Sequence, residues 1–396
     1  MASSGDLPFN VEVLRWAREL AGVDYEQAAK RINKAPEDIR HWEEGRGQPT
    51  VRQARTLAAL YNRPFLEFFL PARPTLPEPA ALADFRTHAG RSRPDSQALA
   101  KIRLWAEQSR NNALDLYDVL GEGPPRFPKK YFGSLDDSPD ELAESARKGI
   151  GPEVSEQIGL PVSRAHVFPR LLRDSIEGVG TLVLRNTDLE AEGARGICIA
   201  EFPLPVMVFS GDDPPQAQAF TILHEFAHVA LRESGISGEV PKADAQRREV
   251  RIERWCNRYA AAFLMPRQVM AQIVGSPPPV PAKNFEDSQL IAYSRTFKVS
   301  RQAMLLRLIH LRYVAEAFYW SKSDDFDAER RGWKAFGRSK YYGARYVNAH
   351  GQRLTRLVLH AWEEGRITDH GAGRFLGIRN LNHLDAIKAD LLRGEG

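Results

Sequence analysis

The feature that most limits the fold is the motif His224-Glu225-x-x-His228 inside the apolar run 220–231. Residues four apart lie on one face of a helix, so this spacing presents two imidazoles to one metal ion and places Glu225 beside an open coordination position. The surrounding apolar residues indicate that the helix is buried. A simpler alternative is a helix with two partly exposed histidines and an ion-paired glutamate. The sequence supplies no partner for that pair, so the motif favours a zinc site on a buried helix.

A zinc ion held by two histidines needs a third protein ligand and an open position for water. The helix predicted within 249–266 has Glu249, Glu253 and Asn257 on one face, a turn apart. We choose Glu253 as the third ligand and expect Asn257 to hydrogen-bond a ligand histidine. Glu249 is the alternative ligand, and a surface ion pair is the alternative for either glutamate. The segment 233–247 is rich in glycine, proline and charge, which indicates a loop bordering a cleft.

Periodicity and prolines divide the chain into four parts. Apolar positions recur every three or four residues in an N-terminal unit of five short helices. These predicted helices span 10–20, 24–32, 36–44, 50–61 and 65–70. Four prolines between 71 and 79 cannot continue a helix and indicate a stiff linker. The predicted domains are 1–71, a linker and helical segment at 72–162, a core at 163–283, and a helical region at 284–396.

Helices dominate the rest of the chain, with one small sheet near the middle. We predict helices over 98–119, 139–148, 152–159 and 166–176, and again from about 216 almost to the end. β-branched runs bounded by glycine, proline and aspartate predict strands at 180–184, 196–199 and 205–209. The fold class is therefore α+β and mostly helical. The strand at 206–209 is a candidate for pairing with an extended substrate, and a plain core strand is the equal alternative.

Composition excludes several classes of protein. With 43% hydrophobic and 27% charged residues among 396, the chain is expected to fold rather than stay disordered. No apolar run approaches the ~20 residues of a membrane span, and the first residues lack the pattern of a secretion signal. Cys198 and Cys256 lie in apolar runs and form no CxxC pair, which argues against a disulfide framework. We expect a cytoplasmic protein without membrane contact.

Charge differs between the two ends of the chain. Residues 1–70 carry ten Lys/Arg and ten Asp/Glu, whereas residues 331–396 carry twelve and six. Phosphate contacts supply most nonspecific affinity for DNA, so the C-terminal end is expected to contribute more of it. Residues 365–384 also have the pattern of a second helix-turn-helix-like element, with a solvated helical face as the alternative. The candidate phosphate contacts at this end are Arg345, Arg353, Arg356, Arg374 and Arg379.

The N-terminal unit has the pattern of a helix-turn-helix, whose second helix enters the major groove of DNA. Arg40 and His41 lie on that predicted helix and Arg46 follows it, so these three are the candidate DNA contacts. Glu37 and Asp38 precede them and would face the phosphates. Docking to a protein, or dimerisation, is therefore an equal alternative to DNA binding.

Two blocks of the sequence resemble the ImmA/IrrE family of zinc metallopeptidases. Residues 219–228 are similar to the family's FTxxHExxH block. Residues 253–266 are similar to its E-x-x-A-N-x-F-A-x-x-L-L-M-P block, with Cys256 in the usual place of alanine. Further likeness at 42–50, 61–71 and 84–86 extends to longer members that begin with an Xre-type helix-turn-helix domain. The resemblance implies a zincin-like, gluzincin-like core in which Zn2+ is bound by His224, His228 and Glu253.

The resemblance also implies a zinc endopeptidase that cleaves a regulatory protein, such as a transcriptional repressor, in stress response or mobile-element control. Glu225 would take a proton from the attacking water and return it to the leaving amine, a role that a purely structural metal site does not need. The alternative is a transcriptional regulator or antitoxin-like binding protein of a toxin–antitoxin or phage-related system, with little peptidase activity. DNA and a toxin protein are then candidate partners beside the protein substrate.

Overall fold

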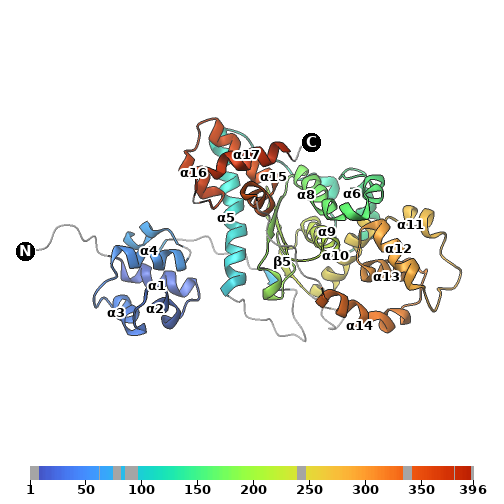
Figure 1. Cartoon of the computed structure of the whole chain (residues 1–396), viewed down its shortest axis with the longest axis horizontal. Helices are drawn as coiled ribbons and strands as arrows, with labels where there is room; N and C mark the ends of the chain where they lie inside the picture. The colour runs from blue at the N-terminus through green and yellow to red at the C-terminus, as the bar shows by residue number, and fades with distance from the viewer. Residues whose placement is uncertain are drawn as a thin grey trace, which may run out of the picture. The chain divides into compact units, whose positions relative to one another are not determined.

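The computed structural model describes residues 9–61, 63–74, 82–84, 97–238, 247–332, 341–378 and 380–393 (Figure 1). The chain divides into two compact units, one formed by Met1–Ala80 with Asp95–Leu104 and the other by Ala81–Pro94 with Trp105–Gly396. None of the helices in the described ranges has the length and apolar character that a bilayer crossing requires. The four-part division made from the sequence stays a prediction.

In the residues that the structure describes, the first unit is helical, as the apolar periodicity predicts. Its elements are α1 (Val11–Leu20), α2 (Tyr25–Ile32), α3 (Pro36–Glu43), α4 (Val51–Leu60) and the 3-10 helix η1 (Phe65–Phe69). The side chains of Asn10 and Asp24 accept backbone N–H groups and so cap α1 and α2. The fifth predicted helix is a 3-10 helix because the segment between Pro64 and Pro71 is too short to propagate an α-helix.

A buried ion pair lies in the core of the first unit. Arg18 on α1 donates from Nε and Nη2 to the carboxylate of Glu43 at the end of α3, at 2.7 and 2.9 Å. Its Nη1 donates to the carbonyl of Val23 at 3.0 Å. Both charged groups therefore have hydrogen-bond partners, and the pair ties α1 to α3.

Helices precede the sheet of the second unit. The long helix α5 (Gln97–Leu120) leads into it. The next elements are η2 (Lys129–Tyr131), α6 (Pro139–Arg147), α7 (Val154–Gly159), η3 (Val162–Val167) and α8 (Phe168–Gly178). The helix predicted from residue 166 begins at Phe168, where Pro169 occupies the first turn. The residues just before it form the 3-10 helix η3 instead.

A mixed five-stranded sheet follows, and η4 (Glu190–Glu192) lies between two of its strands. In spatial order the strands are β1 (Ala83–Asp84), β5 (Gly235–Ser237), β3 (Gly196–Ile199), β4 (Val206–Ser210) and β2 (Leu182–Asn186). β4 pairs in parallel with β2 and antiparallel with β3, while β5 pairs antiparallel with β3 and in parallel with β1. The three predicted strands are present, β2 about two residues later than predicted.

Two features of the sheet differ from the predictions. β5 lies inside 233–247, which was expected to be a loop, because a three-residue strand that starts with Gly235 leaves no alternating pattern. β4 is hydrogen-bonded to a strand on each side, so it has no free edge. The prediction that 206–209 pairs with an extended substrate is therefore wrong, and β4 is a fully buried core strand.

The helix with the histidine motif packs on this sheet. α9 (Pro215–Leu231) contacts β3 and β4 as well as α8 and α10 (Arg248–Leu264), and Figure 1 shows α9 and α10 beside the strands. Cys198 and Cys256 are free thiols buried in the same apolar core. Burial raises the pKa of both thiols well above the ordinary value, so they act as small apolar groups.

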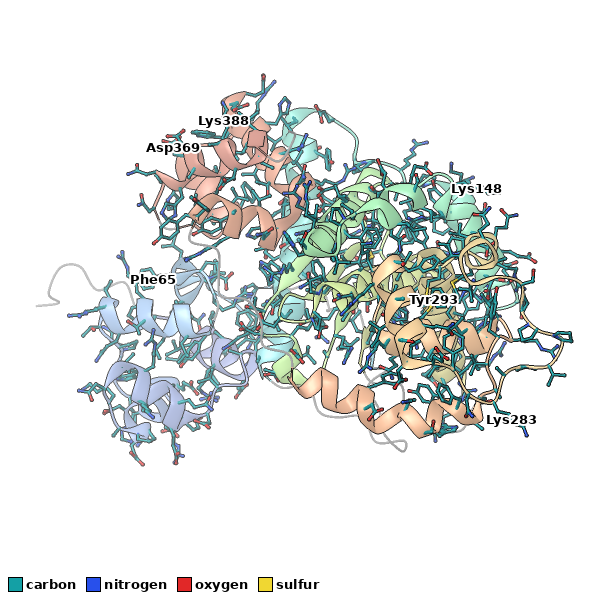
Figure 2. The ribbon with its side chains drawn as sticks, turned by 45° about the vertical axis from the view of Figure 1, so that its right-hand side comes forward. Phe65, Lys148, Lys283, Tyr293, Asp369 and Lys388 are labelled. Atoms are coloured by element: carbon teal, nitrogen blue, oxygen red, sulfur yellow. The ribbon has the colours of Figure 1, made fainter. Side chains whose placement is uncertain are left out.

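Helices complete the second unit, as predicted for the C-terminal region. They are α11 (Arg267–Val274), α12 (Asp287–Phe297), α13 (Arg301–His310), α14 (Ala317–Gly332), α15 (Tyr342–Glu363), α16 (Asp369–Phe375) and α17 (His383–Arg393). α15 is interrupted at Gly351, which has φ 80°, and contacts α8, β2, α16 and α17. Asp369 and Lys388 lie on the outside of the last helices (Figure 2). The predicted second helix-turn-helix-like element at 365–384 thus contains α16 and only the first residues of α17, and its role in DNA binding stays a prediction.

Candidate metal centre

The two motif histidines lie on the buried part of α9 and face one another. All residues from 221 to 231 are buried. The imidazole centroids of His224 and His228 are 5.0 Å apart and their Nε2 atoms 3.2 Å apart. The spacing of four residues therefore brings two ring nitrogens to one point in the interior.

α10 brings a carboxylate to the same point. Glu253 Oε2 lies 3.3 Å from His224 Nε2, and Glu253 Oε1 lies 3.2 Å from His228 Nε2. One ligand atom from each of the three buried residues lies within 4.8 Å of the others. We call these three residues the α9–α10 cluster; in the part of the chain that the structure describes, it is the one such group of potential ligands. Glu249, the alternative ligand, is exposed one turn earlier on α10.

Asn257 lies one turn beyond Glu253, with its Oδ1 3.0 Å from Nδ1 of His224. An amide oxygen only accepts hydrogen bonds, so this contact places the imidazole hydrogen on Nδ1. Nε2 of His224 then keeps its lone pair and directs it toward Glu253 and His228. Asn257 thus occupies the position that was expected for it.

Aromatic packing fixes the face that α10 turns to α9. The rings of Trp255 and Tyr259 stack at 5.5 Å with an interplanar angle of 20°. Trp255 Nε1 donates to the carbonyl of Asp137 at 3.0 Å, and Tyr259 meets the ring of Phe226 on α9 at 6.3 Å. Because these residues alternate with the polar ones along α10, their burial points Glu253 and Asn257 at the histidines.

Glu225 is fully buried, and its carboxylate lies against Gly196 of β3. A Cβ at position 196 would overlap Glu225 Oε1, so the glycine leaves the space that this carboxylate fills. In the described ranges no group forms a well-aligned hydrogen bond to either carboxylate oxygen. Burial raises the pKa of Glu225, and the nearby histidines and the hydroxyl of Ser237 offset part of that rise.

Ser237 on β5 is a neighbour of the cluster that the sequence did not reveal. Its Oγ lies 3.4 Å from His228 Nε2, and the residue pairs with Gly196 in the β3–β5 ladder. A lone serine and a lone glycine match no motif. Their places become visible only once the order of the strands is known.

The charges of the α9–α10 cluster attract one another. Burial disfavours each charged form, but the Glu253 carboxylate outweighs that effect and raises the pKa of His224. The histidines likewise hold the pKa of Glu253 below its usual value despite its burial. The cluster therefore favours a positive charge between its ligand atoms. A proton or a metal cation meets that demand, and a set of two imidazoles and one carboxylate suits Zn2+.

The candidate DNA contacts of the first unit are exposed on α3 or just after it. The guanidinium of Arg40 lies over the ring of Tyr25 at 5.1 Å, Arg46 is ion-paired with Glu44, and His41 is exposed. All three side chains are exposed to solvent. Their contact with DNA stays a prediction.

The C-terminal arginines differ in their availability. Arg353 donates from Nε to the Glu177 carbonyl at 2.8 Å and from Nη1 to the Tyr117 hydroxyl at 3.2 Å. The fold itself uses this side chain, and its contact with phosphate stays a prediction. The others are placed as follows: Arg345 lies over Tyr342, Arg374 near Phe375, Arg356 donates to Gln352, and Arg379 falls outside the described residues.

Comparison with known families finds a match within each unit. The family model described as the IrrE N-terminal-like domain, of the M78 peptidases, matches residues 181–308, which include α9, α10 and the whole α9–α10 cluster. A helix-turn-helix family matches residues 14–68. Searches of curated proteins and of solved structures give no significant match. The chain therefore combines an N-terminal helix-turn-helix domain with an IrrE N-terminal-like domain of the M78 peptidase family.

Proposed function

We propose that this chain is a zinc-dependent endopeptidase that cleaves a regulatory protein, such as a transcriptional repressor, in stress response or mobile-element control. The observation that carries the proposal is the buried cluster of His224, His228 and Glu253 with Glu225 beside it. The M78 match supports a peptidase, and the helix-turn-helix match supports a place in transcriptional control.

The residues of the cluster fit a zinc ion. Two imidazoles and one carboxylate make up a common donor set of catalytic zinc sites, which keep a further position open. Asn257 holds His224 in the tautomer whose Nε2 is free to bind a cation. When bound by His224, His228 and Glu253, Zn2+ lowers the pKa of a water molecule and polarises a peptide carbonyl.

Glu225 is the residue that moves the proton. Its oxygens keep their lone pairs for a water molecule, because no described group forms a well-aligned hydrogen bond with them. One oxygen accepts the proton of the attacking water and then delivers it to the leaving amine. Gly196 contributes by leaving this side chain its space.

The test uses the full-length chain loaded with zinc and a peptide library made by digesting the proteins of a cell extract. New peptide termini are identified by mass spectrometry for the wild type and for Glu225→Gln at equal zinc content. We expect new termini only with the wild type. Identical termini from both proteins, or a wild type that takes up no zinc, would contradict the proposal.

A second function is favoured by the helix-turn-helix match over 14–68. In that case the chain is a DNA-binding transcriptional regulator, or an antitoxin-like partner of a toxin protein. Duplex-DNA binding is measured at several salt concentrations for the wild type and for a variant with alanine at Arg40, His41 and Arg46. Weaker binding and a smaller salt dependence in the variant support DNA binding. Unchanged binding would leave this domain with a protein-docking role.

A further inference from the structure

β5 is the strand of the sheet that reaches the α9–α10 cluster. Ser237 at its end has Oγ 3.4 Å from His228 Nε2. The same residue pairs with Gly196, against which the carboxylate of Glu225 lies. An extended peptide that followed the outer edge of β5 would therefore pass beside Ser237, the residue of this strand that contacts the α9–α10 cluster.

The outer edge of β5 already carries a segment of this chain. β1 pairs with it in parallel, Ala83 opposite Gly235 and Asp84 opposite Ile236, which are the two residues before Ser237. Both strands belong to the second compact unit. The other edge strand of the sheet, β2, contacts α15 instead. β1 of the same chain thus occupies the outer edge of β5, the strand that ends at Ser237.

Strand pairing is exclusive and, at this length, weak. A strand edge offers one row of N–H and C=O groups, so two extended segments cannot pair with the same residues at once. Each backbone hydrogen bond contributes only about 0.5–1.5 kcal/mol net, and β1 is two residues long. A longer extended peptide that presents more hydrogen bonds can therefore displace it.

We propose that the outer edge of β5 is a docking edge for an extended peptide, and that Ala83–Asp84 occupies this edge as a built-in competitor of the substrate. The proposal rests on the peptidase function proposed above for its biological meaning. It does not require cleavage to be tested, because docking precedes chemistry. Release of β1 raises peptide affinity, and with it the rate of cleavage at low peptide concentration.

The probe is the chain's own segment, a fluorescent synthetic peptide with the sequence of residues 79–88. Its binding is measured by anisotropy to the full-length, zinc-loaded Glu225→Gln protein, which cannot turn the peptide over. The test variant adds Ala83→Pro and Asp84→Pro, because proline has no N–H and cannot support the ladder. Arg73→Pro is the matched control, since it places a proline in the same linker outside β1.

We expect at least tenfold tighter peptide binding by the Ala83→Pro, Asp84→Pro variant than by the parent or the Arg73→Pro control. The tethered segment competes at an effective concentration of roughly millimolar in the latter two. A peptide that itself carries proline at both positions should bind none of the proteins. Equal binding by all three proteins, or no binding by the variant, would overturn the docking edge.

If the variant with both prolines does not fold, amide hydrogen exchange of the single variants provides the test instead. The single variants Ala83→Pro and Asp84→Pro are compared with the wild type over residues 235–237, with circular dichroism as the check on folding. Faster exchange there supports the proposal, and unchanged exchange in both contradicts it. The two proposals can fail separately. If the Ala83→Pro, Asp84→Pro variant binds the peptide more tightly but the protein with Glu225 intact cleaves no peptide, the docking edge is retained and the peptidase function is rejected.

Discussion

Two buried charged clusters of the second unit use similar groups and satisfy them in opposite ways. In the α8–α15 cluster, formed by Arg173 and Glu177, donors meet acceptors. Arg173 donates from Nε to the Val183 carbonyl at 2.7 Å and from Nη1 to the Asn348 carbonyl at 2.6 Å. Glu177 Oε2 accepts two backbone N–H groups of α15 at 2.9 and 3.0 Å. The chain completes this cluster by itself.

In the α9–α10 cluster, ring nitrogens and carboxylate oxygens meet in the interior, and Asn257 directs the lone pair of His224 Nε2 into the same space. Two Nε2 atoms and a carboxylate lie within 3.2–3.3 Å of each other, and the nearby Glu225 adds a second carboxylate. Such an arrangement is unfavourable until a cation joins it. The contrast teaches that burial of charge is no sign of function by itself. The useful sign is whether the chain's own donors satisfy the buried acceptors.

Removing a ligand from the α9–α10 cluster should produce the largest effect. His224→Ala and Glu253→Ala are each expected to reduce zinc from about one ion per chain to almost none, because two remaining ligands hold zinc poorly. Elemental analysis after dialysis measures this. Glu249→Ala is the matched control and should keep its zinc, since Glu249 is exposed. The ligand assignment is wrong if Glu249→Ala loses zinc while Glu253→Ala retains it.

The substitution Glu225→Gln should affect turnover and leave zinc in place. An amide keeps the shape of the side chain but cannot accept the proton, so cleavage of a peptide identified in the library experiment should fall by about 10²–10⁴. The free energy of unfolding should stay close to the wild-type value, because the amide is neutral and no described group forms a well-aligned hydrogen bond with the carboxylate. A variant that cleaves at the wild-type rate would remove Glu225 from the mechanism.

Glu177→Gln is the same chemical change in the α8–α15 cluster. Whereas Glu225→Gln should lose cleavage and keep its stability, Glu177→Gln should lose stability. It replaces a carboxylate that accepts the backbone N–H groups of Val183, Gln352 and Arg353 by an amide with one acceptor oxygen, and the loss of such buried hydrogen bonds costs about 1–3 kcal/mol in the free energy of unfolding. Zinc content should be unchanged. Urea denaturation of the two glutamine variants side by side checks both expectations. Equal stability of Glu177→Gln and Glu225→Gln would break the comparison between the clusters.

Gly196→Ala tests the space that holds Glu225. Its Cβ would overlap Glu225 Oε1, so the carboxylate must move. We expect cleavage to fall with zinc retained, and stability to decrease by about 1–3 kcal/mol, the usual cost of overpacking. Gly159→Ala is the control, because open space surrounds a Cβ there. Full activity in Gly196→Ala would show that the position of Glu225 does not depend on this glycine.

The smallest expected effect is a pH dependence near the α8–α15 cluster. Burial lowers the pKa of His350 to about 4, while its Nε2 donates to the Leu376 carbonyl at 3.1 Å. The unfolded chain, with an ordinary histidine pKa near 6.5, therefore binds more protons between pH 4 and 6.5. Stability from His350 is complete above pH 6.5 and is lost as the pH falls toward 4. Lowering the pH from 7 to 5.5 should cost about 1 kcal/mol.

Thermal or urea unfolding at several pH values measures this slope. His350→Gln should flatten it, because glutamine does not titrate. His360→Gln, on an exposed position of the same helix, should leave the slope as it is in the wild type. Parallel slopes for the wild type and His350→Gln would exclude His350 as the origin.

Sequence alone could predict the parts of the site that lie within one helix. The spacing of His224 and His228 and the periodicity of α10 are local, so they gave the ligand face of each helix. The choice between Glu249 and Glu253 needed the rotation of α10, which Trp255 and Tyr259 set by packing on other elements. Strand order is not local either, so the sequence could not decide whether 206–209 pairs with a substrate or is a plain core strand.

Contacts between distant segments were beyond reach for the same reason. Gly196 and Ser237 meet Glu225 and His228 only because β3 and β5 are neighbours under α9. The use of Arg353 inside the fold depends on α15 packing against α8. Counting charges in the sequence includes Arg353 among the available cations, because the sequence does not show that its guanidinium donates to a backbone carbonyl.

The zinc site itself can be located by anomalous diffraction at the zinc edge, from crystals of the full-length chain grown with zinc. We expect one strong peak among Nε2 of His224, Nε2 of His228 and the Glu253 carboxylate, with Glu225 beside it and not bound to the metal. No peak at that point, or a peak whose ligands include Glu249 instead of Glu253, would contradict the zinc site proposed for this chain.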